Sequence, residues 1–460
     1  MMLRILLILS IAMTFAMCQS STERSTGSQT DETNESDDKV RIMTLDPGHF
    51  HAALIQKSMY EDVDPIVHVF APPGEDLQAH LARIEGFNTR ETNPTSWDLQ
   101  IYAGPGFFEK MIAEKPGNLM NISGNNQKKT EYIKATVDAG IHVLADKPMA
   151  INAEGFALLE EAFQVAEENG VLLYDIMTER YEITTIIQRE LSQMPEVFGE
   201  LLPGTPEEPA ITKESVHHFY KYVSGSPLTR PAWFFDVEQQ GDGMVDVGTH
   251  LVDLIQWEAF PEVILAKEDI EITSSRRWAT ELSREMFERV TKLSEFPDYL
   301  QKYVEDNVLK VYSNGEINYQ LKGINAKISV IWNYQAPEGA ADTHYSIMRG
   351  SKSDLIIEQG EKEGYKPQLY IESGSDVSGA LATAIEALSD RYPGLAVQQL
   401  ADDRWSLLIP DKYKVGHEAH FAQVTAKYLE YLKQGKLPDW EVPNMIVKYH
   451  TTTSGLAVAQ

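Results

Sequence analysis

The sequence has one cysteine, few basic side chains for its length, and no long apolar run beyond its first 17 residues. Its 40 lysines and arginines stand against 69 aspartates and glutamates, which gives a formal net charge of -29. Because such an acidic surface repels phosphate groups and no basic cluster offsets it, nucleic-acid binding is excluded. The lone cysteine, Cys18, leaves no disulfide for the rest of the chain, so the fold must rest on core packing. With 460 residues the chain is long enough for two or three domains.

The first 17 residues have the pattern of a targeting segment. Arg4 supplies a positive charge, residues 5–17 form an apolar run too short to span a bilayer comfortably, and Cys18 follows directly. This arrangement resembles a bacterial lipoprotein signal, in which the cysteine becomes the lipidated first residue. An ordinary signal peptide with an incidental cysteine is the alternative. We predict a signal peptide over 1–17 and an exported, periplasmic or outer-membrane lipoprotein of a bacterium, which meets the membrane only through a lipid anchor on Cys18.

Residues 18–39 are polar and contain no aromatic or large aliphatic side chain, so they predict a disordered tether. From residue 40, short apolar runs alternate with longer amphipathic stretches, which predicts a doubly wound parallel sheet of the Rossmann type over 40–176. Its strands are expected at 40–45, 66–70, 99–102, 119–122, 142–145 and 171–176, and its first helix near 52–59. After residue 176 the alternation stops. Glycine-bounded strands there predict an α+β domain over 177–460 with a mostly antiparallel, open sheet, and include 308–312, 317–321, 324–332 and 354–358.

The turn after the first strand reads Asp46-Pro47-Gly48-His49-Phe50-His51, in the place and context of a dinucleotide-binding G-x-G-x-x-G turn. Only the second glycine is present, as Gly48. That glycine still allows a pyrophosphate to approach the backbone, and the following helix would attract it, whereas the carboxylate of Asp46 would repel it. The second strand does not end in the acid that binds an adenosine ribose, so only Glu75 or Asp76 of the next loop could serve.

Two later motifs are more specific. Residues 123–126 read Ser-Gly-Asn-Asn and residues 139–148 read Ala-Gly-Ile-His-Val-Leu-Ala-Asp-Lys-Pro, which places Lys147 21 residues after Asn126. Residues 241–253 read Gly-Asp-Gly-Met-Val-Asp-Val-Gly-Thr-His-Leu-Val-Asp. In this order and spacing the motifs resemble the Gfo/Idh/MocA family of oxidoreductases. A strand-end lysine in a surface ion pair is the alternative interpretation of Lys147.

The last motif places Asp246, His250 and Asp253 on one face if it is helical, at positions i, i+4 and i+7. Asp246 would then orient His250 and stabilise its charge, as a carboxylate does for a catalytic imidazole. A capped helix with a histidine in the core is the alternative. Two carboxylates after a glycine-rich turn favour the catalytic interpretation.

The family resemblance implies an oxidoreductase that acts on a hydroxyl of a sugar or glycoside, with NAD as cofactor and NADP less favoured. It implies catalysis by Lys147, Asp246 and His250, in which His250 takes the hydroxyl proton as hydride leaves and Lys147 polarises the oxygen. The residues expected to contact the cofactor are Gly48, His49, Phe50, Asn125, Asn126, Asp146 and Lys147. The open sheet of this family often mediates dimers, so a homodimer or higher oligomer is left open.

The candidates for substrate contact are Arg180, His218, Trp233 and Asp253. His217 and His218 are adjacent in a strand-like run, so only one of them can face a pocket. His49 and His51 could ligate a metal, but two histidines on a turn without a nearby Cys or Glu make a weak site, and we expect no metal ion. His417 is expected on the surface at the start of a helix.

Two other functions fit parts of the pattern. An NAD-assisted glycoside hydrolase of the same fold would oxidise, eliminate and reduce within one site, and would release a cleaved glycoside without net redox change. It would need the same Lys147 and His250. A non-catalytic carbohydrate-binding lipoprotein would explain Asp46 and the missing glycines, but it leaves Lys147 and His250 without a purpose. Product identity and cofactor content discriminate among these three functions.

Overall fold

The computed structural model describes residues 39–223, 226–337 and 339–460, and residues 39–460 form one compact unit. The predicted signal peptide, the predicted lipidation site Cys18 and nearly all of the predicted tether lie outside the described residues. Within the part that is described, none of the helices is long and apolar enough to cross a membrane.

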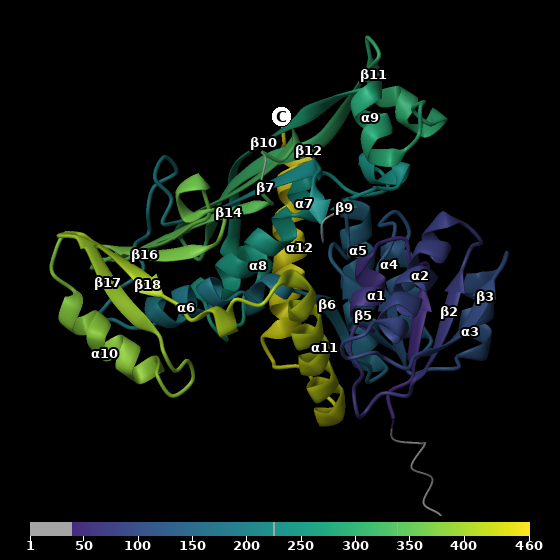
Figure 1. Cartoon of the computed structure of the whole chain (residues 1–460), viewed down its shortest axis with the longest axis horizontal. Coiled ribbons are helices and arrows are strands. Elements are labelled where there is room, and N and C mark those ends of the chain that lie inside the picture. Colours follow the sequence, from purple (N-terminus) through teal and green to yellow (C-terminus); the bar gives the residue numbers. More distant parts are fainter. Residues whose placement is uncertain (1–38, 224–225, 338) are drawn as a thin grey trace, which may run out of the picture. The chain divides into compact units, whose positions relative to one another are not determined.

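The first part of the chain forms a six-stranded parallel sheet in the order β3-β2-β1-β4-β5-β6, with helices packed against it (Figure 1). The strands are β1 (Ile42–Leu45), β2 (Ile66–Ala71), β3 (Asp98–Ala103), β4 (Leu119–Ile122), β5 (His142–Asp146) and β6 (Leu173–Ile176). The helices are α1 (His51–Leu54), α2 (Glu75–Thr89), α3 (Phe107–Glu114), α4 (Lys129–Asp138) and α5 (Ala153–Glu168). This strand order is that of a Rossmann sheet and confirms the predicted fold class.

The central strands β1 and β4 are buried along their whole length, as expected for parallel strands between helices, and so is the edge strand β6. Leu45 of β1 pairs with Ile122 of β4, and Ile122 is also in register with Ala145 of β5. The carboxyl ends of three strands therefore lie side by side. The order of the sheet reverses between β1 and β4, so this edge is where doubly wound folds bind ligands.

The second part of the chain forms a larger sheet in the order β10-β12-β13-β7-β14-β15-β16-β18-β17. Its strands are β7 (Ile211–Tyr220), β10 (Ile270–Ser283), β12 (Val308–Leu321), β13 (Ile324–Gln335), β14 (Thr343–Arg349), β15 (Asp354–Glu358), β16 (Gln368–Glu372), β17 (Ala396–Ala401) and β18 (Arg404–Leu408). Short strands are β8 (Tyr222–Val223), β9 (Ser226–Pro227) and β11 (Val304–Glu305). Neighbours are antiparallel except β13 and β7, which confirms the predicted, mostly antiparallel sheet.

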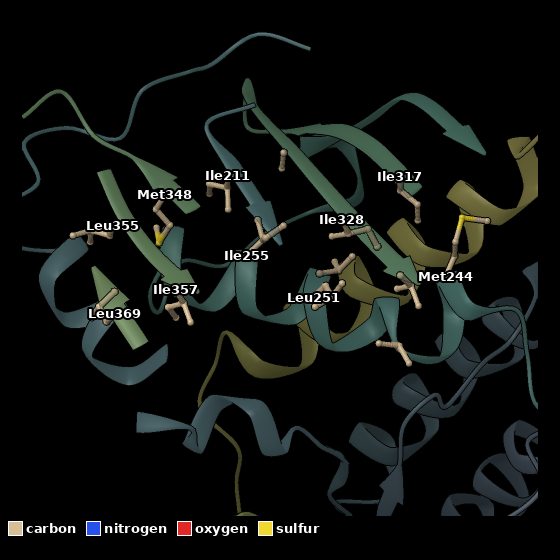
Figure 2. Close-up of a cluster of buried hydrophobic side chains, with 14 of the residues drawn as sticks. Ile211, Met244, Leu251, Ile255, Ile317, Ile328, Met348, Leu355, Ile357 and Leu369 are labelled. Atoms are coloured by element: carbon tan, nitrogen blue, oxygen red, sulfur yellow. The ribbon is translucent and has the colours of Figure 1, made fainter. Parts of the chain in front are cut away.

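The helices of this part are α6 (Ile183–Ser192), α7 (Gly243–Asp246), α8 (Gly248–Ala259), α9 (Arg284–Thr291) and α10 (Ser378–Leu388). Figure 2 shows Leu251 and Ile255 of α8 within the apolar cluster that also holds Ile211 of β7 and Ile328 of β13. These four side chains are at most 2% exposed. Because this packing fixes α8, it also fixes the helix's first turn, which carries His250.

The strands predicted at 308–312 and 317–321 are one continuous strand, β12. Gly315 lies between the two predicted segments. A Cβ at this position would lie 2.2 Å from Cγ of Met244 in α7, so the glycine allows a helix to approach the strand. The glycine therefore marks close packing and not the turn that the sequence suggested.

The C-terminal helices α11 (His417–Gln434) and α12 (Glu441–Val458) return to the first sheet. The hydroxyl of Tyr428 lies 3.0 Å from the carbonyl oxygen of Val143 and 2.9 Å from that of Leu172. The hydroxyl of Tyr449 donates to Asp175 at 2.8 Å. Both tyrosines belong to the buried cluster of the first sheet. Residues far beyond position 176 therefore complete the core of the Rossmann sheet.

Candidate active site

The turn after β1 is held against the end of β4. Asp46 has a φ of 47°, the amide of Gly48 donates to the Asp46 carbonyl oxygen at 2.8 Å, and the amide of His49 donates to that of Ser123 at 3.3 Å. A Cβ on Gly124 would lie 2.2 Å from the Asp46 carbonyl oxygen, so only glycine fits there. Residues 123–126 thus supply the glycine, Gly124, that lets the backbone of the turn after β1 pack closely.

Gly48 faces a small cradle of polar atoms. A Cβ on it would lie 3.1 Å from Oδ2 of Asp76, 3.4 Å from the amide nitrogen of Asn125 and 3.4 Å from the ring of Trp233. The indole Nε1 of Trp233 donates to the same Asp76 oxygen at 3.1 Å. Burial raises the pKa of Asp76 and that of Asp46, and the charge of Asp76 raises the latter further. Asp76, in the first turn of α2, is therefore the acid beside this turn.

Asn125 and Asn126 follow β4 and tie the first sheet to the loop before α7. Nδ2 of Asn125 donates to Oε1 of Gln239 at 2.8 Å, and Nδ2 of Asn126 donates to the carbonyl oxygen of Gln240 at 2.7 Å. Oδ1 of Asn126 is buried and has no hydrogen-bond partner among the described residues. Buried polar atoms without partners are rare, and this one marks a place where a ligand could bind.

An ion pair joins the end of β5 to α7. Nζ of Lys147 lies 2.6 Å from Oδ1 of Asp246, and Nε2 of Gln240 donates to the other carboxylate oxygen at 3.0 Å. The side chains of Lys147 and Asp246 are 12% and 8% exposed. Within the described chain Asp246 makes no hydrogen bond to His250, and its two oxygens accept from Lys147 and Gln240 instead. The expectation that Asp246 orients His250 is therefore wrong, and Asp246 holds Lys147 instead.

His250 lies in the first turn of α8, and its Nδ1 is buried without a partner among the described residues. Burial lowers the pKa of His250 well below its ordinary value, and the nearby charges of Lys147 and His417 lower it further. The imidazole is therefore neutral at pH 7 and has a lone pair with which to accept a proton.

The turn after β1 also contacts the end of β5. Nδ1 of His51 lies 2.9 Å from Oδ2 of Asp146, Nδ1 of His49 lies 3.6 Å from the same atom, and the ring of Phe50 packs against both imidazoles. Nζ of Lys129 donates to the carbonyl oxygen of Asp146 at 3.0 Å, and burial lowers its pKa to about 8. The sequence suggested a weak metal site because no Cys or Glu lay near the two histidines. The folded chain brings a different carboxylate beside them, since Asp146 is 95 residues from His51 along the chain but in direct contact with it.

His417 and Gln240 belong to this region although the sequence did not indicate them. His417 is exposed at the start of α11, as expected, but its ring lies 5.2 Å from the ring of His51. This contact depends on how α11 packs against the first sheet, so no local pattern could reveal it. Gln240 directly precedes the glycine-rich motif, and that position was the available signal.

Arg180 and Asp253, which were expected to contact substrate, belong to a buried ion network. Arg180 donates to both oxygens of Asp253 at 2.7 Å and to Glu441 at 2.9 Å. Nζ of Lys448 lies 2.8 Å from Asp253 and 2.7 Å from Asp175. Burial alone would raise the pKa of Asp253, but Arg180 and Lys448 hold it well below its ordinary value. These charges are satisfied within the protein, which indicates a role in stability rather than in substrate contact.

A second polar cluster lies on β7. Nδ1 of His217 is 3.0 Å from Oδ2 of Asp342, and Nε2 of His217 is 2.7 Å from Oγ of Ser215. Nδ1 of His218 is 3.4 Å from Oδ1 of Asp342, and Lys221 pairs with the same carboxylate. The side chain of His218 is 5% exposed and that of His217 is 22% exposed. His218, the predicted substrate residue, is therefore the more buried of the two.

A Rossmann sheet with a lysine at its carboxyl edge, paired with a carboxylate of a second sheet domain, is the architecture of a two-domain oxidoreductase. Residues 187–460, more than half of the chain, match the family model described as "Putative oxidoreductase C terminal domain". The chain belongs to this family of Gfo/Idh/MocA-type oxidoreductases.

Three relatives illustrate the range of similarity. A crystal structure of a "putative oxidoreductase" from Parabacteroides merdae ATCC 43184 is 57% identical, with a TM-score of 0.90 over 92% of this chain and 98% of that one. D-xylose 1-dehydrogenase (NADP(+)) 2 of Haloferax volcanii is 23% identical over 39% of this chain, so the chain spans about half (50%) of the curated relative it matches. A 3-ketoreductase from Actinomadura kijaniata, solved with NADP and TDP-benzene, is 12% identical, with a TM-score of 0.56 over 92% of this chain and 98% of that one. Solved structures of this fold hold NADP or NAD.

Proposed function

We propose that this protein is an NAD(P)-dependent oxidoreductase that acts on a hydroxyl of a sugar or glycoside. The observation that carries the proposal is the Lys147–Asp246 ion pair at the carboxyl edge of β5, together with Nδ1 of His250, which has no partner within the described part of the chain. Membership of an oxidoreductase family supports it. The D-xylose dehydrogenase and the 3-ketoreductase among the relatives support a sugar-type substrate.

The residues at the strand ends fit a nicotinamide dinucleotide. Gly48 leaves its cradle free of a side chain, beside the amide of Asn125 and the ring of Trp233, and Oδ1 of Asn126 lacks a partner among the described residues. Because α1 has only four residues, phosphate binding would rest on amides of the turn and little on a helix dipole. When bound, the cofactor would accept or return a hydride at the substrate carbon.

The protein's own part in the reaction is to hold the substrate oxygen and move its proton. His250, neutral because burial lowers its pKa, takes the hydroxyl proton in the oxidative direction and returns it in the reductive one. The ammonium of Lys147 donates a hydrogen bond to the same oxygen and stabilises the negative charge that develops on it. Asp246 and Gln240 fix the position of that ammonium.

The acidic turn favours NAD over NADP. The carboxylates of Asp46 and Asp76 lie beside the Gly48 cradle, and the additional 2′-phosphate of NADP would be repelled by this negative charge. Relatives nevertheless use or hold NADP, so both cofactors belong in any assay.

A non-catalytic carbohydrate-binding protein is the second candidate, and the same turn favours it. Two carboxylates and a four-residue helix make this region less suited to a pyrophosphate than a glycine-rich turn before a full helix. The intact Lys147–Asp246 pair favours the enzyme, because a binding protein would not need a buried ammonium held by a carboxylate.

The test is an assay of the full-length protein with NAD⁺ and NADP⁺ against a panel of free pyranoses and glycosides. Reduction of the nicotinamide, with a product lighter by two hydrogens in the mass spectrum, is the expected result. A cleaved glycoside without net redox change would point to the NAD-assisted glycoside hydrolase. Sugar binding with neither turnover nor nucleotide would overturn the proposal in favour of a binding protein.

We also propose that the protein is exported and anchored through a lipid on Cys18. Arg4, the apolar run over 5–17 and the position of Cys18 support this. Cells that carry Cys18→Ala should lose the protein from the membrane fraction. A variant that fractionates with membranes as the wild type does would contradict the anchor.

A further inference from the structure

We propose that His49, His51 and Asp146 bind one divalent transition-metal ion of the zinc type. The inference goes beyond the proposed function, because metal binding by these side chains requires neither the nicotinamide cofactor nor turnover. The two histidines come from the turn after β1, and the aspartate ends β5. One ligand atom from each side chain lies within 4.8 Å of the others.

The distances between the ligand atoms suit a single ion. An ion about 2.0–2.1 Å from each ligand in a tetrahedral arrangement needs ligand atoms roughly 3.3 Å apart. Oδ2 of Asp146 lies 2.9 Å from Nδ1 of His51 and 3.6 Å from Nδ1 of His49, which bracket that separation. The two imidazole rings stand at 83° to each other with centroids 4.1 Å apart. Nδ1 of His49 also accepts a hydrogen bond from the backbone amide of His51 at 3.3 Å, so the imidazole must release this contact when it binds the ion.

The buried carboxylate also favours a cation. The carboxylate of Asp146 is 6% exposed, and the two histidines are its direct side-chain partners in the described chain. A buried carboxylate is costly unless hydrogen bonds or a cation compensate it.

Two ammonium groups lie nearby, but both are engaged elsewhere. Lys147 donates to Asp246 at 2.6 Å, and Lys129 donates to the backbone carbonyl oxygen of Asp146 at 3.0 Å. The carboxylate of Asp146 is thus left to the imidazoles. The contact from Lys129 fixes the backbone of the aspartate, as groups behind a metal ligand commonly do.

The ligand set defines the class of ion. Two imidazoles and one carboxylate suit zinc, and the same set with open positions also suits ferrous iron. Three protein ligands leave a fourth position for water or substrate, as in catalytic zinc sites. His417 is the nearest further imidazole, with its ring 5.2 Å from that of His51.

The experiment measures metal content and affinity in the full-length protein, purified without a polyhistidine tag and stripped with a chelator. Zn²⁺ is returned, excess is removed, and bound metal is counted by mass spectrometry; Co²⁺ is then titrated while its visible absorption is recorded. We expect one equivalent of zinc per chain and the strong visible bands of four-coordinate cobalt. His51→Ala and Asp146→Asn should each weaken binding by at least about 100-fold, more than changes behind a metal ligand usually cost.

His68→Ala is the matched control, because it removes one half-buried imidazole from β2, outside the cluster. It should bind zinc as the wild type does. Should His51→Ala fail to fold, Asp146→Asn and His49→Ala, whose imidazole is 22% exposed, provide the same test. Less than one equivalent of metal in the wild type, or wild-type affinity in the cluster variants, would overturn the proposal. Either result would leave the oxidoreductase proposal standing, since turnover is not the readout.

Discussion

Lys147, Asp246 and His250 are the residues proposed to act on a substrate oxygen. We expect Lys147→Ala and His250→Ala each to lower turnover by about 10²–10⁴-fold, the usual range for general acid–base groups. Asp246→Asn should lower it less, because the amide can still contact Gln240 but no longer pairs with the ammonium. The measurement is kcat with the substrate that the sugar panel identifies.

Lys110→Ala is the control for this series. Lys110 pairs with Glu114 on the exposed side of α3, and such surface pairs contribute little. Turnover near the wild-type value in Lys147→Ala or His250→Ala would remove that residue from the mechanism.

Asp253 is expected to matter for stability and not for substrate contact. Asp253→Asn would leave Arg180 and Lys448 buried without their shared carboxylate, and breaking a buried pair costs about 3–5 kcal/mol. Chemical denaturation should show a loss of this order, with KM unchanged wherever the variant is folded. A raised KM at wild-type stability would instead make Asp253 a substrate residue.

At single residues the sequence indicated candidate side chains but not their contacts. Lys147 and His250 were singled out because each stands in a motif of fixed spacing. The partner of Asp246 could not be predicted, because the i, i+4 spacing of a helix suggests His250 while the folded chain brings Lys147 from 99 residues away. The contact between His51 and Asp146 was missed for the same reason, since His51 begins α1 and Asp146 ends β5.

Helix α11 packs into the buried cluster of the first sheet through Tyr428. The Tyr428 hydroxyl lies within hydrogen-bond distance of the carbonyl oxygens of Val143 in β5 and Leu172 just before β6, and the side chain is fully buried. Tyr428→Phe should lower the free energy of unfolding by about 1 kcal/mol, the typical net value of one buried hydrogen bond. The midpoint of guanidinium denaturation measures it.

Tyr102→Phe is the matched control, because its hydroxyl bonds to the carbonyl oxygen of Pro105 at an exposed position. It should leave the midpoint within error of the wild type. An equal loss in both variants, or none in Tyr428→Phe, would mean that α11 does not anchor through this hydroxyl.

Among the elements, the buried parallel strands were the easiest to predict, because continuous apolar runs between turns have few other interpretations. The strand predicted at 119–122 coincides with β4. The first helix was predicted near 52–59 but spans only His51–Leu54, since the chain turns away after four residues. Gly315 misled the prediction of β12, because a glycine that admits a packed helix has the same local sequence pattern as one in a turn.

At the scale of the whole molecule, buried neutral histidines should make the fold sensitive to acid. Burial lowers the pKa of His80 and His420 to about 4 and that of His344 to about 3. In the unfolded chain these imidazoles bind protons near pH 6.5, so the unfolded state takes up more protons as the pH falls. His51 and His250 act in the same sense. Stability is therefore present above about pH 6.5 and is lost progressively below it.

Buried carboxyl groups act in the opposite sense. Burial raises the pKa of Glu179 to about 7 and that of Asp242 to about 6, and these two groups favour the folded state as the pH falls through this range. Imidazoles with a lowered pKa outnumber these two groups, and we expect the guanidinium midpoint to decrease as the pH is lowered from about 7.5 to about 5.5. A midpoint that stays constant or increases as the pH is lowered over this range would show that the histidines are not buried as neutral groups.

The central claim is that the edge of the first sheet binds a nicotinamide dinucleotide. Isothermal titration of the full-length protein with NAD⁺, NADH, NADP⁺ and NADPH tests it most directly, with Gly48→Val as the companion variant. The valine side chain at position 48 would enter the cradle between Asp76, Asn125 and Trp233, where even a Cβ meets atoms at 3.1–3.4 Å. We expect one site per chain, tighter for NAD(H) than for NADP(H), and a loss of at least about 10-fold in the variant. No binding of any of the four nucleotides up to millimolar concentration, or equal binding by Gly48→Val, would contradict the claim.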